Sequence, residues 1–171
     1  MFKLDLDDNE AAFSAALVSF HTQPNDVFLV VGTGQDVTLA PRACKQAYLH
    51  TYRVADEGRS LELLHKTEVD DVPKALLAFQ GRLVAGVGKA LRLYDLGKKK
   101  LLRKSENKVR RSPALSPSSR ADFSLPSPVA RQQTFASMIM TLNTQGSRII
   151  VGDAQESIYF AVYKAVSYTH L

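Results

Sequence analysis

The chain has 171 residues, of which 45% are apolar and 23% are charged, and this mixture predicts one globular domain with a buried core. Its one cysteine, Cys44, excludes an intrachain disulfide, and no apolar run approaches the roughly 18 residues that a membrane-spanning helix needs. The net charge of +5 is uneven, because residues 98–111 hold eight basic residues and one acidic residue. We therefore expect one basic patch rather than a uniformly basic surface.

Short segments rich in Val, Leu, Ile, Tyr and Phe, with turn residues between them, predict an all-β fold. The first expected group of strands is 12–20, 27–32, 47–54 and 60–66, with a long loop at 35–46. The second group is 74–79, 82–86, 90–96 and 100–104, and the third is 137–142, 147–152 and 157–163. Residues 11–20 contain four alanines and also suit a helix, but Asn9 and Glu10 make a poor cap, so a strand is favoured.

A repeated unit organises these strands. An apolar run that ends in glycine occurs three times, at Gly32, Gly86 and Gly152, and each run is followed by a polar turn and another strand. Four-stranded units of about 40 to 50 residues are typical of β-propeller blades, which must stack to bury their faces. The sequence therefore predicts a partial β-propeller of about two to three four-stranded, WD40-like blades.

Residues 109–133 break the pattern, because they are rich in Ser, Pro and Arg and show no strand periodicity. Such a composition predicts a disordered insert. The expected organisation is two blades in residues 1–108, the insert in 109–135 and a partial third blade in 136–164. The tail, residues 165–171, does not continue the blade pattern.

Two glycine-containing segments resemble nucleotide loops only in part. Residues 31–34 lack the third glycine of a dinucleotide loop, since Val37 stands there, and we expect a turn. Residues 86–89 lack the spacing of a phosphate-binding loop, which would need glycine at Leu83 and a hydroxyl at Ala90. The four histidines also lack metal-ligand spacing. We therefore expect no catalytic, cofactor or metal site.

The basic segment offers five candidate contact residues: Lys98, Lys99, Lys100, Arg103 and Lys104. Three interpretations remain open. Lysines protect the edge strand of a sheet from pairing with another sheet. Cations also bind RNA phosphates or an acidic partner, without reading sequence. A run of this kind is also typical of a nuclear-import signal.

Residues 9–20, 61–108 and 142–164 closely resemble the splicing factor 3b subunit 3 family. This is the spliceosomal branch of a group of triple-propeller proteins that includes the large subunits of damaged-DNA-binding and cleavage-and-polyadenylation complexes. The run 65–108 is specific for the spliceosomal branch. Residues 109–133 depart from the family, which indicates a translated intron, a misjoined reading frame or a lineage-specific loop. The tail, residues 166–171, also departs from the family.

The resemblance implies a nuclear, non-catalytic scaffold in pre-mRNA splicing, without a small-molecule substrate. Its implied setting is the splicing factor 3b complex of the U2 small nuclear ribonucleoprotein, with the HEAT-repeat subunit as the main neighbour. One alternative is an RNA-contacting module built on residues 98–111. Another is a related scaffold in DNA repair or mRNA 3′-end processing.

Overall fold

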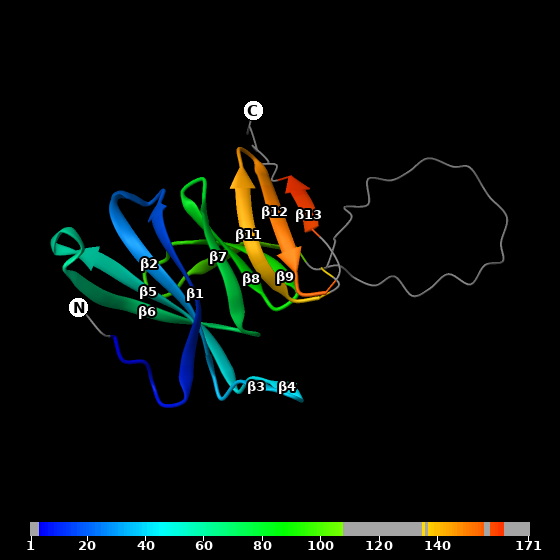
Figure 1. Ribbon diagram of the computed structural model, residues 1–171. Helices are drawn as coiled ribbons and strands as arrows, with labels where there is room; N and C mark the ends of the chain where they lie inside the picture. Colours follow the sequence, from blue (N-terminus) through cyan, green and yellow to red (C-terminus); the bar gives the residue numbers. More distant parts are fainter. Residues whose placement is uncertain (1–3, 108–134, 136, 156–157, 163–171) are drawn as a thin grey trace, which may run out of the picture.

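The computed structural model describes residues 4–107, 135, 137–155 and 158–162 (Figure 1). The expected insert and tail lie outside these residues, except for Phe135. The described elements are, in chain order, β1 (Glu10–Phe20), β2 (Gln23–Gln35), β3 (Thr38–Leu39), β4 (Arg42–Ala43), β5 (Gln46–Ala55), the 3-10 helix η1 (Asp56–Gly58), β6 (Ser60–Val69), β7 (Pro73–Phe79), β8 (Arg82–Val87), β9 (Ala90–Asp95), β10 (Leu102–Asn107), β11 (Ile139–Gln145), β12 (Arg148–Asp153) and β13 (Ile158–Val162).

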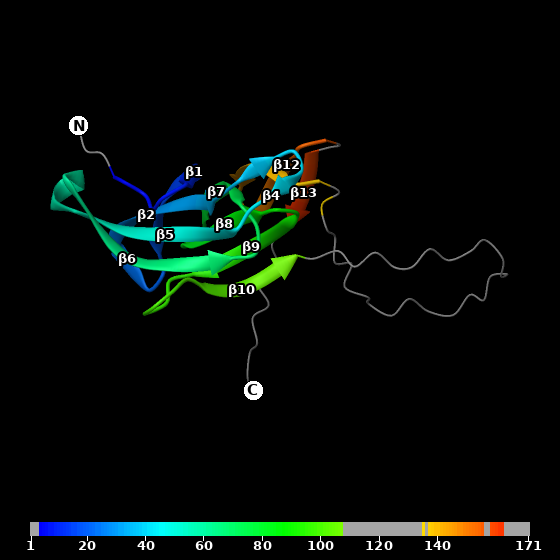
Figure 2. The ribbon, with the colours of Figure 1, turned by 90° about the horizontal axis from the view of Figure 1, so that it is seen from below.

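The strands form three antiparallel sheets in which neighbours along the chain are also neighbours in space. Sheet 1 has the order β1-β2-β5-β6, sheet 2 has β7-β8-β9-β10 and sheet 3 has β11-β12-β13, while β3 and β4 make a separate small hairpin. The first strands of the sheets, β1, β7 and β11, lie side by side near the centre (Figure 1). Seen from below, β6 and β10 lie at the outside (Figure 2). Antiparallel sheets that stack with their first strands side by side confirm the all-β, partial-propeller prediction.

Two apolar joints hold the three sheets together. Phe28 and Val30 of sheet 1 pack against Leu83 of sheet 2, and all three side chains are 0% exposed. On the other face of sheet 2, Val84 packs in a cluster with Ile149 of sheet 3. Strand β8 is therefore covered on both faces, which explains why its sequence is a continuous apolar run rather than an alternating one.

Phe135 belongs to the second joint. Its side chain is 4% exposed and packs edge-on against Tyr159, with ring centroids 5.0 Å apart. This residue lies within the range assigned to the insert, yet it contributes to the core between sheets 2 and 3.

The turn predicted at residues 31–34 is wrong, since Gly32 and Gly34 lie inside β2. Close packing explains these glycines. A Cβ on Gly32 would lie 2.5 Å from the carbonyl oxygen of Pro73, and one on Gly34 would lie 2.9 Å from a methyl group of Val72. The glycines therefore make room for the next sheet, and no helix follows them as a nucleotide loop would require.

Candidate functional site

The five basic candidates lie at the outer edge of sheet 2. Lys98, Lys99 and Lys100 occupy the loop between β9 and β10, whereas Arg103 and Lys104 lie on β10, an end strand of the sheet. All five are exposed. The place of Arg103 and Lys104 on this end strand agrees with the interpretation that basic residues protect the edge. The exposure of all five leaves their charges accessible to a partner.

A buried leucine interrupts the basic segment. Leu101 is 2% exposed and packs in the joint between sheets 1 and 2. Its backbone N–H donates a hydrogen bond of 2.9 Å to Oγ1 of Thr67 in β6. Residues 98–104 are therefore fixed to sheet 1 at their central residue, with cations on either side of it.

The cations are divided between two grooves. Lys100 and Arg103 line a groove of about 630 Å³, which is also lined by residues of β6 and by Arg92 and Tyr94 of β9. Lys98 lines a separate groove of about 300 Å³ beside Arg53. Lys99 and Lys104 line neither of these grooves. The structure thus brings two of the five candidates together and does not join all five into one site.

The larger groove carries charges of both signs. Arg92 is 3% exposed and makes an ion pair with Asp70, and Glu68 also lines the groove. Burial raises the pKa of Tyr94, although Arg92 opposes this effect, so the phenol stays protonated at neutral pH. The charged side chains that line this groove are four cations, Lys66, Arg92, Lys100 and Arg103, and two carboxylates, Glu68 and Asp70, so its lining carries a net positive charge.

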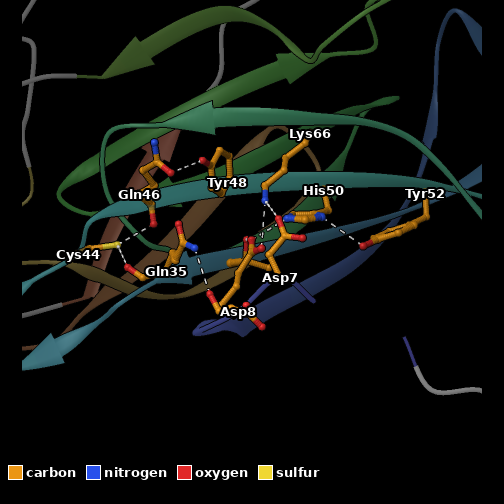
Figure 3. A network of polar contacts seen from close by, with 11 residues as sticks. Asp7, Asp8, Gln35, Cys44, Gln46, Tyr48, His50, Tyr52 and Lys66 are labelled. Atoms are coloured by element: carbon orange, nitrogen blue, oxygen red, sulfur yellow. Dashed lines mark hydrogen bonds and ion pairs between the residues drawn. The ribbon is translucent and has the colours of Figure 1, made fainter. Parts of the chain in front are cut away.

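A second polar cluster lies on sheet 1, on the face that strand alternation turns away from sheet 2 (Figure 3). At its centre, Glu10 has a side chain that is 0% exposed. Its Oε1 accepts hydrogen bonds from Thr33 and, at 2.7 Å, from His50, while its Oε2 is 3.1 Å from Nζ of Lys66. Lys66 also pairs with Asp7 at 2.7 Å. This buried carboxylate is fully partnered.

The contacts of Glu10 fix its protonation state. Burial raises the pKa of the carboxyl group, but the hydrogen bonds from Thr33, His50 and Lys66 outweigh this effect and leave the pKa below its ordinary value of 4.5. Burial likewise lowers the pKa of Lys66, yet its bonds to Asp7 and Glu10 raise it overall. Glu10 is therefore ionised at neutral pH, which suits a structural ion pair better than a general acid.

The described residues include no group of three or more His, Cys, Asp or Glu side chains placed to hold a metal ion. The thiol of Cys44 lies 2.9 Å from the carbonyl oxygen of Gln46, and burial lowers the pKa of His65. None of the helices in the part of the chain that the structure describes is long and apolar enough to cross a membrane.

Comparison with known proteins places these features in a family. The model of the CPSF A subunit region matches residues 1–113. The chain is 56% identical over 162 residues to pre-mRNA-splicing factor RSE1 of Mycosarcoma maydis, which is 95% of this chain. It is 43% identical to spliceosome-associated protein 130 A of Arabidopsis thaliana and 42% identical to splicing factor 3B subunit 3 of Danio rerio, in each case over 94% of its length.

The chain spans only 11% of the length of each of these relatives. They carry the names of splicing proteins, and the resemblance found in residues 61–108 and 142–164 is confirmed by them. The stacked four-stranded sheets and the match over residues 1–113 support membership of the same family. The chain belongs to the CPSF A subunit region family.

Proposed function

We propose that the chain is part of a non-catalytic propeller scaffold that acts in pre-mRNA splicing through contacts with other proteins. The observation that carries the proposal is the identity of 42–56% with splicing proteins from a fungus, a plant and an animal. Two features of the structure support a scaffold: the joints between sheets are buried and apolar, and the charged side chains of the two polar clusters are paired with one another.

The proposed setting is the splicing factor 3b complex of the U2 small nuclear ribonucleoprotein, in the nucleus. The name of the zebrafish relative, splicing factor 3B subunit 3, supports this choice. The HEAT-repeat subunit of that complex is the proposed main partner. Contact through the outer surfaces of the sheets agrees with the exposed edge at β10.

Affinity purification tests this proposal. The protein that carries this chain is tagged at its chromosomal locus and purified from nuclear extract, and the bound proteins and small nuclear RNAs are identified. We expect splicing factor 3b proteins, the HEAT-repeat subunit among them, together with U2 RNA. Recovery of DNA-repair or 3′-end-processing proteins in their place would overturn the proposal.

A second candidate function is RNA contact through residues 98–111, which the exposed cations Lys98, Lys99, Lys100 and Lys104 favour. Phosphate contacts release counterions, so such binding weakens steeply as salt is raised. The test is ultraviolet crosslinking in the purified complex, with all five basic candidates changed to alanine. Loss of RNA crosslinks to this segment, with the protein composition unchanged, would favour RNA contact. Unchanged crosslinking would count against RNA contact through these residues and leave the scaffold as the one proposed function.

A further inference from the structure

The three sheets share a small repeat near the start of their inner strands. In each inner strand a register shift occurs, and the residue after the shift pairs with a glycine in the second strand. The three pairs are Ser14–Gly32, Ala75–Gly86 and Thr141–Gly152, and the residues before the shifts are Ala12, Pro73 and Ile139. We call each such pair a socket, because the glycine leaves a space on the face of its sheet.

Pro73 of sheet 2 fills the socket of sheet 1. A Cβ on Gly32 would lie 2.8 Å from Cγ of Pro73, so no larger residue fits without displacing the proline. The hydroxyl group of Ser14 donates a hydrogen bond of 2.5 Å to the carbonyl oxygen of Pro73. This socket therefore holds the first residue of the next inner strand by both shape and a hydrogen bond.

Ile139 of sheet 3 fills the socket of sheet 2. A Cβ on Gly86 would lie 2.5 Å from Cγ2 of Ile139, a side chain that is 0% exposed. Here Ala75 supplies no hydroxyl group, and the backbone N–H of Ile139 donates to the carbonyl oxygen of Gly88 at 2.8 Å. The same position of the incoming strand is thus used again, with a β-branched side chain in place of proline.

The socket of sheet 3 is open. Among the described residues, only Thr141 has atoms within 4 Å of a Cβ built on Gly152. Thr141 is exposed and carries a hydroxyl group, as Ser14 does. Ile158 pairs with Gly152 and lies on the same face, as does Phe160, and these apolar side chains are 68% and 71% exposed. The face around the socket is therefore apolar and uncovered by the described residues.

We propose that Thr141 and Gly152 bind the first residue of the inner strand of a fourth sheet, and that this residue is proline or β-branched. The hydroxyl group of Thr141 donates a hydrogen bond to the carbonyl oxygen of that residue, as Ser14 does to Pro73. A fourth sheet is the expected occupant because the two filled sockets are each filled by the next sheet along the chain. The matched part of this chain is only 11% of the length of a relative, which therefore contains further sequence. The inference does not depend on a role in splicing.

Thiol labelling on the uncovered face tests the proposal. The full chain carries Cys44→Ser and Ile158→Cys, and it is extended after Leu171 by a flexible linker and a second copy of residues 71–107. This copy is the sheet whose Pro73 already fills a socket with a hydroxyl group. A short flexible tether gives a millimolar effective concentration. We expect maleimide to label position 158 at least about tenfold more slowly than in the unextended chain, as an occupied interface requires.

Two variants show whether slow labelling of position 158 depends on the socket or only on coverage of the face. Thr141→Ala with Gly152→Ala fills the socket, and sheet 3 itself tolerates the added methyl group because only Thr141 would touch it. In this variant the protection should disappear, while the unextended chain should label as before. Thr141→Ala alone leaves a socket of the Ala75–Gly86 kind and should reduce protection about fivefold, the effect of one neutral hydrogen bond.

Two results would overturn the proposal. One is equal labelling of the extended and unextended chains. The other is protection that survives when both socket residues are changed, because the face would then be covered without use of the socket. Pro73→Gly in the appended copy alone is the matched control for the incoming residue, and it should restore rapid labelling.

Discussion

The joint between sheets 1 and 2 and the groove at their outer edge involve the same two sheets but contain opposite kinds of side chain. In the joint, Phe28 and Leu83 are fully buried in a cluster of hydrophobic side chains. In the groove, the buried Arg92 makes an ion pair with Asp70, whose side chain is 68% exposed, and Lys100 is also exposed. Stacking of the sheets therefore determines the shape of the molecule, whereas the charges at the outer edge can change without altering that shape.

Removal of an aromatic ring from the joint should have the largest effect. Phe28→Ala should lower the free energy of unfolding by about 4 kcal/mol, because it leaves a cavity beside Phe20, whose ring centroid is 5.5 Å away. Urea denaturation of the full chain, followed by circular dichroism, measures the change. The control is Leu17→Ala, at a side chain that is 62% exposed, which should change stability by less than about 0.5 kcal/mol. Equal losses in the two variants would remove the distinction between the joint and the surface.

Replacement of Glu10 tests whether the buried ion cluster on sheet 1 contributes to the free energy of unfolding, as the apolar joint does. Glu10→Ala should lower the free energy of unfolding by about 3 kcal/mol, because it leaves the buried His50 and the partly buried Lys66 without their common carboxylate. Urea denaturation at pH 7 measures this loss. A change near zero would show that the cluster is only an exposed surface contact.

Acid should weaken the same cluster. The pKa of Glu10 is depressed in the folded chain, so its contribution to stability is present above the ordinary value of 4.5 and is lost as pH falls through the lower folded pKa. We expect the free energy of unfolding to decrease over this acid range. Glu10→Gln is the control, since it keeps the shape of the side chain and should flatten this part of the pH dependence.

A change in a filled socket should have a smaller effect on stability. Gly86→Ala should lower the free energy of unfolding by about 2 kcal/mol, because the new methyl group overlaps Ile139 of the next sheet. A double-mutant cycle with Ile139→Ala locates the cause. The two changes together should cost less than the sum of the single changes, since the second makes room for the first. Simple additivity would place the strain elsewhere in sheet 2.

The five basic candidates should matter least for stability. Replacement of Lys98, Lys99, Lys100, Arg103 and Lys104 by alanine should change the free energy of unfolding by less than about 0.5 kcal/mol for each residue, because all five are exposed. Thermal unfolding of the five-residue variant measures this. A large loss would mean that the outer edge supports the fold as the joints do.

The sequence predicted the larger strands well, because their apolar runs and turn glycines are local signals. The hairpin of β3 and β4 was missed, as its strands have only two residues each and show no periodicity. It is fixed by a distant contact, an ion pair of 2.6 Å between Arg42 and Asp71. The second strand begins at Gln23 rather than at the expected residue 27. In the turn before it, the N–H of His21 donates to the carbonyl oxygen of Gly81, which lies between β7 and β8 of sheet 2. Both features depend on contacts with residues far away in the sequence, and a prediction from a short stretch of sequence cannot include such contacts.

The candidate site, too, could be predicted only where its features are local in the sequence. Exposure of the lysines could be predicted because a run of charge is a local property. The division into two grooves could not, since it depends on Leu101 reaching Thr67 in another sheet. The cluster around Glu10 was also missed, because its partners Thr33, His50 and Lys66 lie 23, 40 and 56 residues away in sequence.

The anchoring of Leu101 has a consequence for nuclear import. An import receptor that binds an extended basic peptide would need residues 98–104 to leave the sheet, and Leu101 to leave a core in which it is 2% exposed. Exposure of a leucine side chain costs about 2 kcal/mol, before the strand pairing of β10 with β9 is counted. While the sheets are assembled, therefore, this segment is accessible as a folded surface, and recognition as a linear peptide belongs to the time before the strand has paired.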